Sequence, residues 1–360
     1  MSKLTKDKII ELESLRGIAA ILVVYAHMPN WHNFFESPIK ANAYLMVDFF
    51  FVLSGFVIYT NYQNKINNFK DLFKFQFLRF GRLYPVHISI ILLYIVFYSI
   101  KYFYQTYINM SFLSPVFDSG FMTELVSNIF LLQGFTNNEH IINPPSWSIS
   151  LEFYTYLIFA LVILRNQFKL FYFLTFSLVP CFILYSGKTY GMENSFRCLA
   201  GFFMGCLSVM IASKIKGYPR IYLSFLIGIF FVIFLIFKGS AEYDVFVYLI
   251  SSALIISLAA YPKGKLNEYL KLPAFLWLGK MSYPIYMSHF IFIWIMQVFV
   301  EKFLRVSNVD KKYLLSFSKA FAIYLLFYLA VFIAASFLHK YIEEPIRKKT
   351  RFFIKNNNEK

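Results

Sequence analysis

Ten stretches of mostly apolar residues divide this chain, and each is close to the length of a helix that crosses a lipid bilayer. A spanning helix needs about 20 such residues, and it must satisfy its own backbone hydrogen bonds inside the hydrocarbon core. The stretches are Arg16–Met28, which extends outward by a few residues, Ala43–Tyr62, Leu83–Phe103, Trp147–Leu164, Leu170–Ser186, Phe196–Ser213, Ile221–Phe237, Val245–Tyr261, Tyr283–Phe303 and Leu314–Leu338. We therefore predict an all-α fold, a polytopic membrane helix bundle with about ten transmembrane helices. Two further pieces, Glu124–Gln133 and Leu272–Leu278, are too short to span, and we interpret them as re-entrant or interfacial segments.

The composition and the charge distribution agree with a membrane protein. Hydrophobic residues make up 59% of the chain and charged residues 15%, against about 45–50% and about 25% in ordinary soluble domains. The net charge of +16 would suggest a nucleic-acid partner on a soluble chain. Here the Lys and Arg residues concentrate before the first stretch and after the second, fourth, sixth, eighth and tenth. This alternation follows the positive-inside rule, so we predict a multi-pass protein of the cell membrane with both termini in the cytoplasm and no nucleic-acid partner.

The chain shows no internal repeat and no low-complexity linker. The sequence therefore predicts a single membrane domain over residues 1–348, followed by a basic cytoplasmic tail over residues 349–360. The three cysteines, Cys181, Cys198 and Cys206, lie in apolar runs without Cys-x-x-Cys spacing and without a histidine–cysteine cluster. Such cysteines are typically small buried hydrophobes, so we expect no metal site.

Ionisable residues inside the apolar stretches are the candidates for function. A charged side chain at the bilayer centre costs about 2.5–3.5 kcal/mol on insertion scales, so such residues usually face the bundle interior and serve a site. They are His27, Asp48, His87, Glu152, Arg197 and His289. We interpret His289, which shares its segment with Tyr283 and Tyr286, as a packed histidine.

Arg16 and His27 lie eleven residues apart in the stretch "ESLRGIAAILVVYAHMPN". Eleven residues of helix rise about 16 Å over about three turns, so both side chains can point to one side. Arg16 is then near the cytoplasmic face and His27 beyond the middle of the membrane, where an imidazole suits general-base work. The alternative is structural, with His27 bonded to a backbone carbonyl and Arg16 anchoring the helix at the interface.

Three further motifs carry charged residues. Asp48, in "VDFFFVLSGFVI", could orient His27, pair with a cation, or sit at the interface in water. Arg79 and Arg82, in "FLRFGRLYPVH", lie one turn apart and could form a fork for a phosphate group, or simply flank a span on its cytoplasmic side. Glu152, in "NPPSWSISLEFYTY", enters the fourth span, where a buried glutamate is a base, an acid or a hydrogen-bond hub.

The order of these motifs resembles the acyltransferase-3 family of integral membrane acyltransferases. The features are an Arg-x10-His first helix, "DFFFVLSGF", Arg-x-x-Arg before "LYP", "SWSISLEFYTY", "LGKMSYPIYMSHF" and a closing "EEP", in order from Glu13 to Lys348. The resemblance implies a helix bundle that moves an acyl group, most often acetyl from acetyl-CoA, onto a hydroxyl of an extracytoplasmic sugar. It assigns the family's arginine–histidine pair to Arg16 and His27 and its phosphate-binding arginine pair to Arg79 and Arg82. It also assigns the family's tryptophan-to-glutamate motif to Trp147 and Glu152, and its aspartate to Asp48.

The expected function is therefore that of a membrane O-acyltransferase with acetyl-CoA as donor and a surface or lipid-linked glycan as acceptor. His27 would act as general base, oriented by Glu152 or Asp48, or would carry the acyl group itself. The arginine pair would grip the CoA phosphates, and Arg16 would add to that grip or stabilise the thioester oxygen. Two alternatives come from other classes. A transporter or flippase of a lipid-linked glycan does not explain the arginine pair, and a glycosyltransferase using a polyprenyl phosphate sugar favours a carboxylate base in an outer loop.

Overall fold

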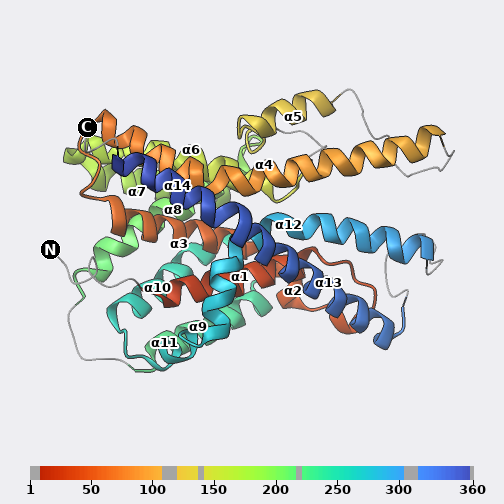
Figure 1. The fold of residues 1–360 in the computed structure, drawn as a ribbon. Coiled ribbons are helices and arrows are strands. Elements are labelled where there is room, and N and C mark those ends of the chain that lie inside the picture. Colours follow the sequence, from red (N-terminus) through yellow and green to blue (C-terminus); the bar gives the residue numbers. More distant parts are fainter. Residues whose placement is uncertain (1–8, 108–119, 137–141, 216–220, 304–314, 357–360) are drawn as a thin grey trace.

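The computed structural model describes residues 9–107, 120–136, 142–215, 221–303 and 315–356, and the regular structure within these ranges is helical throughout. The elements are α1 (Glu11–His27), η2 (Asn33–Phe35), α2 (Pro38–Asn42), η3 (Ala43–Leu45), α3 (Met46–Tyr62), α4 (Phe69–Tyr107), α5 (Phe121–Ile129), α6 (Ser146–Leu164), η4 (Asn166–Phe168), α7 (Lys169–Tyr185), α8 (Glu193–Ala212), α9 (Leu223–Phe237), η5 (Ala241–Val245), α10 (Phe246–Ala260), α11 (Lys265–Leu270), α12 (Pro273–Phe303), α13 (Phe317–Leu338), the π-helical turn η6 (His339–Glu343) and α14 (Glu344–Asn356). Figure 1 shows most of the long helices running side by side along one common direction.

Within the described ranges, seven helical segments are long and apolar enough to cross a membrane. They are Pro38–Tyr62, Phe69–Tyr107, Ser146–Leu164, Glu193–Ala212, Ala241–Ala260, Pro273–Val300 and Phe317–Asn356. Helices α7 and α9 are apolar but shorter, and α1 has 17 residues. Together they follow the predicted stretches in order, so the all-α polytopic bundle is confirmed. The side of the membrane that each end faces stays a prediction.

One of the two short pieces was assigned wrongly from the sequence. Leu272–Leu278 belongs to the beginning of a spanning helix, because α12 starts at Pro273 and runs without a break to Phe303. Lys280 and Pro284 interrupt the apolar pattern there, but a proline inside a membrane helix is tolerated where neighbouring helices pack against it. The other piece overlaps α5, which at nine residues is too short to span.

Helices α1 and α12 pack in parallel, and their closest approach is set by two glycines. A methyl group on Gly17 would lie 2.6 Å from the backbone nitrogen of Gly279, so only the absence of side chains lets the two backbones meet. Ten residues further along each helix, His27 meets His289. Both pairs are separated by 262 residues in the sequence. This common register aligns one face of α1 with one face of α12 along most of the length of α1.

Helix α14 lies antiparallel on the first part of α4, as Figure 1 shows for the dark blue and orange helices. A methyl group on Gly81 would lie 2.4 Å from Thr350 Oγ1, so the Thr350 side chain packs directly against the backbone of α4 at this glycine. Nearby, the rings of Phe77 and Phe353 pack in a tilted arrangement with centroids 5.9 Å apart. The helix passes residue 348 without a break, so the boundary drawn there from the sequence falls inside a packed helix. Residues 357–360 lie outside the described part.

The core lies mainly between α3, α6 and α8. Phe56, Phe159 and Phe202 are among the largest fully buried side chains, and the rings of Phe159 and Phe202 have centroids 5.7 Å apart. Burying an aromatic side chain stabilises the fold through area and ring packing. This core holds α3 and α6 in fixed positions beside α1.

Candidate active site

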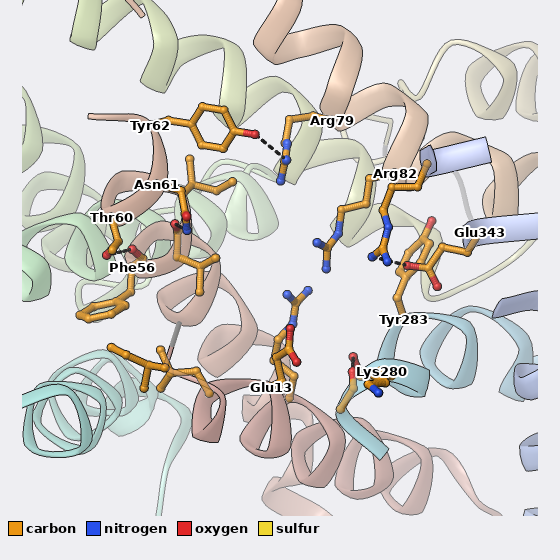
Figure 2. A pocket seen from close by; sticks show the side chains of 18 of the residues that line it. Glu13, Phe56, Thr60, Asn61, Tyr62, Arg79, Arg82, Lys280, Tyr283 and Glu343 are labelled. Carbon is orange, nitrogen blue, oxygen red and sulfur yellow. Dashed lines mark hydrogen bonds and ion pairs between the residues drawn. The ribbon is translucent and has the colours of Figure 1, made fainter. Parts of the chain in front are cut away.

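A cavity of about 670 Å³ opens at one end of the bundle. Its wall is built from the first part of α1, the end of α3, the first part of α4, the early part of α12 and the junction of α13 with α14. Figure 2 shows Arg79 and Arg82 reaching into this space from one side, with Glu13 and Lys280 on the opposite side. Ligand sites commonly have volumes of about 300–1,000 Å³, so the cavity is large enough for a cofactor-sized molecule. Because α1 and α14 both line it, the first and last described helices meet at the same end of the bundle.

Positive charge dominates the cavity wall. Seven of its residues are Lys or Arg and three are Glu, and the basic ones are Arg16, Lys65, Arg79, Arg82, Lys280, Arg347 and Arg351. The Nε atoms of Arg16, Arg79 and Arg347 are buried without a hydrogen-bond partner. A buried donor that lacks a partner is costly, and the cavity wall thus has more guanidinium donors than its own acceptors satisfy.

The three arginines predicted to bind the donor all line this cavity. Arg79 is held by a hydrogen bond from its Nη2 to Tyr62 Oη at 3.1 Å, and its guanidinium lies over the Tyr62 ring at 5.2 Å. Arg16 comes from the opposite wall and interacts electrostatically with Arg82 and with Glu152. Guanidinium groups from α1 and α4 thus converge on one space, although they are more than 60 residues apart in sequence.

A second, smaller pocket of about 40 Å³ adjoins the cavity. Arg16, Ser282 and Tyr283 line both spaces, so the two are neighbours along α1 and α12. The small pocket is otherwise lined by Val47, Phe50, Phe51, Ser148, Ile149, Glu152 and Tyr286. A mostly apolar slot with a few polar groups is the usual form of a site that orients a small substituent.

Glu152 is the acceptor of a hydrogen-bond cluster beside the small pocket. Its Oε1 accepts hydrogen bonds from Tyr156 Oη at 2.5 Å and from Ser54 Oγ. The Ser54 and Tyr156 hydroxyls are 2.9 Å apart. The cluster holds the Glu152 carboxylate near Arg16, and Arg16 lines both the small pocket and the large cavity.

His27 and His289 form a pair at the far end of the α1–α12 contact. His289 is fully buried, while His27 is exposed, and the ring centroids are 5.2 Å apart. His289 Nδ1 lies 2.6 Å from the Tyr286 carbonyl oxygen, and its Nε2 lies 3.3 Å from His27 Nδ1. His27 Nδ1 is also 2.9 Å from the Val23 carbonyl oxygen.

These distances assign the tautomers of both rings. Carbonyl oxygens only accept, so Nδ1 of each histidine carries the proton. His289 Nε2 is then an acceptor for the His27 Nδ1 proton, which is shared with the Val23 carbonyl. The lone pair of His27 Nε2 is left for another partner, and this is the protonation state that a general base requires. Because the orienting contact comes from His289, the structure identifies a residue that we had interpreted as merely packed.

Asp48 lies elsewhere. It accepts hydrogen bonds from Arg197 Nε at 3.0 Å, from Arg197 Nη2 at 2.7 Å and from Tyr248 Oη at 2.8 Å. This is the cation pairing that the sequence left open as one of its roles. Among the contacts of the described residues, neither Asp48 nor Glu152 reaches His27, so the expected carboxylate orienter is replaced by the imidazole of His289.

Sequence reasoning included His289 among the candidates but interpreted it as a packed histidine, and it did not consider Lys280, Arg347 and Arg351 as site residues. A signal for His289 was present, because both histidines follow a glycine by ten residues, at Gly17 and Gly279. Equal spacing from two small residues fits two helices that pack in parallel at those glycines. The C-terminal arginines gave no comparable signal, since a run of cations after the last span is equally well explained by the positive-inside rule.

A known family matches this chain nearly end to end. The family described as "Acyltransferase domain" matches residues 9–341. The chain belongs to the acyltransferase-3 family. The family predicted from the motifs is thereby confirmed, and so is the class of enzyme, an acyltransferase in a membrane.

Several named proteins are similar to this acyltransferase-3 chain. O-acetyltransferase OatA of Staphylococcus aureus is 26% identical over 94% of this chain and 57% of its own length. Protein 2 in picA locus of Rhizobium radiobacter is 31% identical over 44% of this chain and 85% of that protein. Acyltransferase MdmB of Streptomyces mycarofaciens is 28% identical over 43% of this chain and 40% of its own length. The chain thus spans little more than half the length of OatA, and no solved structure matches it.

The sequence predicts that the protein has no metal site. Among the residues that the structure describes, no three His, Cys, Asp or Glu side chains lie close enough to share a metal ion. The expected absence of a metal stays a prediction.

Replacing His289 by phenylalanine should lower kcat by about tenfold or more, with little change in the KM for the donor. Phenylalanine keeps roughly the ring volume but removes the acceptor for the His27 Nδ1 proton. The lost hydrogen bond is one that strengthens when His27 takes up a proton, because its donor is then charged. Steady-state kinetics on the purified variant measure kcat and the KM for the donor separately. Ser288→Ala is the matched control, because the Ser288 hydroxyl donates to Pro284 within its own helix at 2.8 Å. An unchanged kcat in a well-inserted His289→Phe protein would show that the pair does not position His27.

Proposed function

We propose that the protein transfers an acyl group, most often acetyl, from acyl-CoA in the cytoplasm to a hydroxyl of a surface or lipid-linked glycan on the other side of the cell membrane. One observation carries the proposal: a cavity rich in arginine lies at one end of α1, and a histidine with an available Nε2 lies at the other. The helix between Arg16 and His27 is continuous, so about 16 Å separates the two residues. A donor with an anionic head and a long flexible arm fits that separation.

The donor is argued from charge and shape. Acyl-CoA carries several phosphate groups at one end and a thioester at the end of its pantetheine arm. Phosphates suit the cluster of guanidinium groups, because arginine binds phosphate through paired, charge-assisted hydrogen bonds. The smaller pocket beside Arg16 and Glu152 then gives the arm a route between the helices toward Tyr286. The Tyr286 ring, which lines the small pocket, has its centroid 6.0 Å from that of His289, so one side chain separates this pocket from the histidine pair.

The chemistry follows from the state of His27. In direct transfer, the acceptor oxygen attacks the thioester carbonyl carbon while His27 Nε2 takes the hydroxyl proton. The carbon–sulfur bond then breaks, and the departing CoA thiolate takes a proton back. In the other route, Nε2 attacks the thioester carbonyl carbon and expels the CoA thiolate. The hydroxyl oxygen then attacks the acyl-imidazole, the acyl–nitrogen bond breaks, and the hydroxyl proton passes through Nε2 to the thiolate. Both routes use the same lone pair, and both need His289 to hold the ring.

The sidedness is argued from the sequence. The positive-inside pattern predicts that the chain ends lie in the cytoplasm, and the cavity lies at the end of the bundle where α1 begins and α14 runs. CoA esters are cytoplasmic molecules, so the donor enters from that side. Transfer of acetyl to a hydroxyl is supported by the O-acetyltransferase name that OatA carries, and the glycan acceptor is taken from the resemblance to the family. A transporter without covalent chemistry accounts for neither the family nor the orientation of the histidines.

The proposed reaction is tested on purified protein in lipid nanodiscs with acetyl-CoA labelled on the acetyl group. We expect release of free CoA and transfer of label to an envelope glycan extract, and mass analysis of surface glycans should show acetyl groups only in cells that make the protein. A preparation with His27→Gln is the control for non-enzymatic thioester hydrolysis. If glycans from cells with and without the protein have the same mass and no CoA is released above that control, the proposal is wrong.

A further inference from the structure

The C-terminal helix α14 adds a second pair of arginines to the cavity. Arg347 and Arg351 lie one helical turn apart, and both line the cavity wall. The helix is held against α4 at the contact of Gly81 with Thr350. Gly81 stands between Arg79 and Arg82 in the sequence. The contact that docks α14 therefore brings the two arginine pairs onto neighbouring helices around one space.

The state of Arg347 indicates a ligand. Its Nη1 is 3.9 Å from Glu343 Oε1, which is the limit of an ion pair, and its Nε is buried without a hydrogen-bond partner. Glu343 also lies 2.8 Å from His339 Nδ1, so its charge is shared within the π-helical turn. Arg347 thus keeps donor capacity for an anion in the cavity, and Arg351 stands beside it on the same helical face.

Two arginine pairs exceed what a single phosphate needs. One pair provides a bidentate fork for one phosphate or for one diphosphate. A donor attached to a carrier protein through phosphopantetheine brings one phosphodiester, whereas acyl-CoA brings a diphosphate and a separate phosphate on the 3′ oxygen of its ribose. The number and the placement of the pairs therefore favour the molecule with two separated phosphate groups.

We infer that Arg347 and Arg351 bind the ribose 3′-phosphate of acyl-CoA, while Arg79 and Arg82 bind its diphosphate. This inference rests on the proposed function, because it takes an acyl-CoA as the donor. It assigns a binding role to Arg347 and, beyond the domain boundary predicted at residue 348, to Arg351, and it makes α14 a part of the donor site. It also gives the enzyme a means of selecting a CoA ester over other thioesters.

The test compares acetyl-CoA with acetyl-3′-dephospho-CoA, which lacks only the 3′-phosphate. For the wild-type protein we expect a KM about tenfold or more higher for the dephospho donor, the size of one charge-assisted hydrogen bond. Arg351→Ala should raise the KM for acetyl-CoA by a similar factor and leave the KM for the dephospho donor unchanged, so that the preference disappears. Arg79→Ala should raise both KM values and keep their ratio.

Lys348→Ala is the matched control, because it removes the same charge from the same helix. Lys348 is exposed and pairs with Glu344 at 2.8 Å, and it does not belong to the lining of the cavity. We expect this variant to keep the wild-type preference. A preference that survives in the Arg351→Ala protein, or one that Lys348→Ala removes equally, overturns the assignment.

A binding measurement separates this inference from the proposed reaction. Calorimetry on the protein in nanodiscs compares adenosine 3′,5′-bisphosphate with adenosine 5′-monophosphate. We expect the bisphosphate to bind about tenfold more tightly or better, and Arg351→Ala to remove the difference. If neither donor is turned over, the proposed function fails, and this measurement still decides the inference: equal binding of the two nucleotides overturns it. Thermal unfolding of the Arg351→Ala protein verifies that the exposed substitution leaves the fold intact.

Discussion

Replacing His27 by glutamine should lower the rate of acyl transfer by about 10²–10⁴-fold, the range that loss of a general base typically costs. Glutamine can keep a hydrogen bond to the Val23 carbonyl, which now accepts from His27 Nδ1 at 2.9 Å. It cannot take a proton from a hydroxyl at neutral pH, and it cannot form an acyl-imidazole. The rate of label transfer from acetyl-CoA measures the loss, and the amount of protein in the membrane measures insertion.

Two comparisons separate catalysis by His27 from a packing role. His27→Ala should insert normally and be equally inactive, because the side chain is exposed and alanine is tolerated in an apolar helix. His32→Gln is the matched control, since His32 lies five residues further on and caps a short helix through the Phe34 backbone nitrogen. We expect near wild-type transfer from that protein. Full turnover by a well-inserted His27→Gln protein would rule out the catalytic assignment and leave Glu152 and His289 as candidates.

The helices were predictable because each carries its own signal. A run of about 20 apolar residues can satisfy its backbone in lipid only as a helix, and this held for α6 and α8 with errors of a few residues at their ends. It failed at Leu272–Leu278, because Lys280 and Pro284 break the apolar run without breaking the helix. Local composition therefore predicts where a span exists and much less well where it begins.

The arginine-rich cavity was predictable in part for a similar reason. Arg79 and Arg82 are neighbours on one helix, so their convergence follows from the helical period alone. Arg16 could be added only through the resemblance to a family, and Arg347 could not be found at all. Its place in the cavity depends on α14 turning back through the π-helical turn and docking at Gly81, and no local pattern encodes that contact.

The histidine pair shows the same limit more sharply. An orienter for His27 was expected among the carboxylates, because a charged partner is the common device for holding an imidazole. The orienter in the structure is a neutral ring 262 residues away, and it is placed by the close approach of Gly17 and Gly279. Asp48, one of the two carboxylates expected to orient His27, is instead bound by Arg197 through two hydrogen bonds. Helix register decides which partner is reached, and register depends on backbone contacts between distant glycines.

Replacing both Arg79 and Arg82 by alanine should raise the KM for acetyl-CoA by about 10²–10⁴-fold. Each charge-assisted hydrogen bond contributes about 1.5–3 kcal/mol, which corresponds to about 10- to 150-fold for each single variant. The two residues share one ligand, so the double variant can fall short of the product of the two. Lysine at either position should restore only part of the affinity, because it supplies the charge without the planar fork.

The kcat at saturating donor decides whether the arginine pair acts through binding alone. The reacting thioester is expected near His27, about 16 Å along α1 from the level of Arg16, so loss of the phosphate grip should leave the chemical step largely intact. Lys74→Ala is the matched control, since Lys74 is on the same helix, pairs with Asp71 at 3.9 Å and lies outside the cavity lining. A donor KM that stays at the wild-type value in both single variants would refute the assignment. A fall in kcat equal to the rise in KM would instead mean that the grip on the phosphates also positions the thioester for attack.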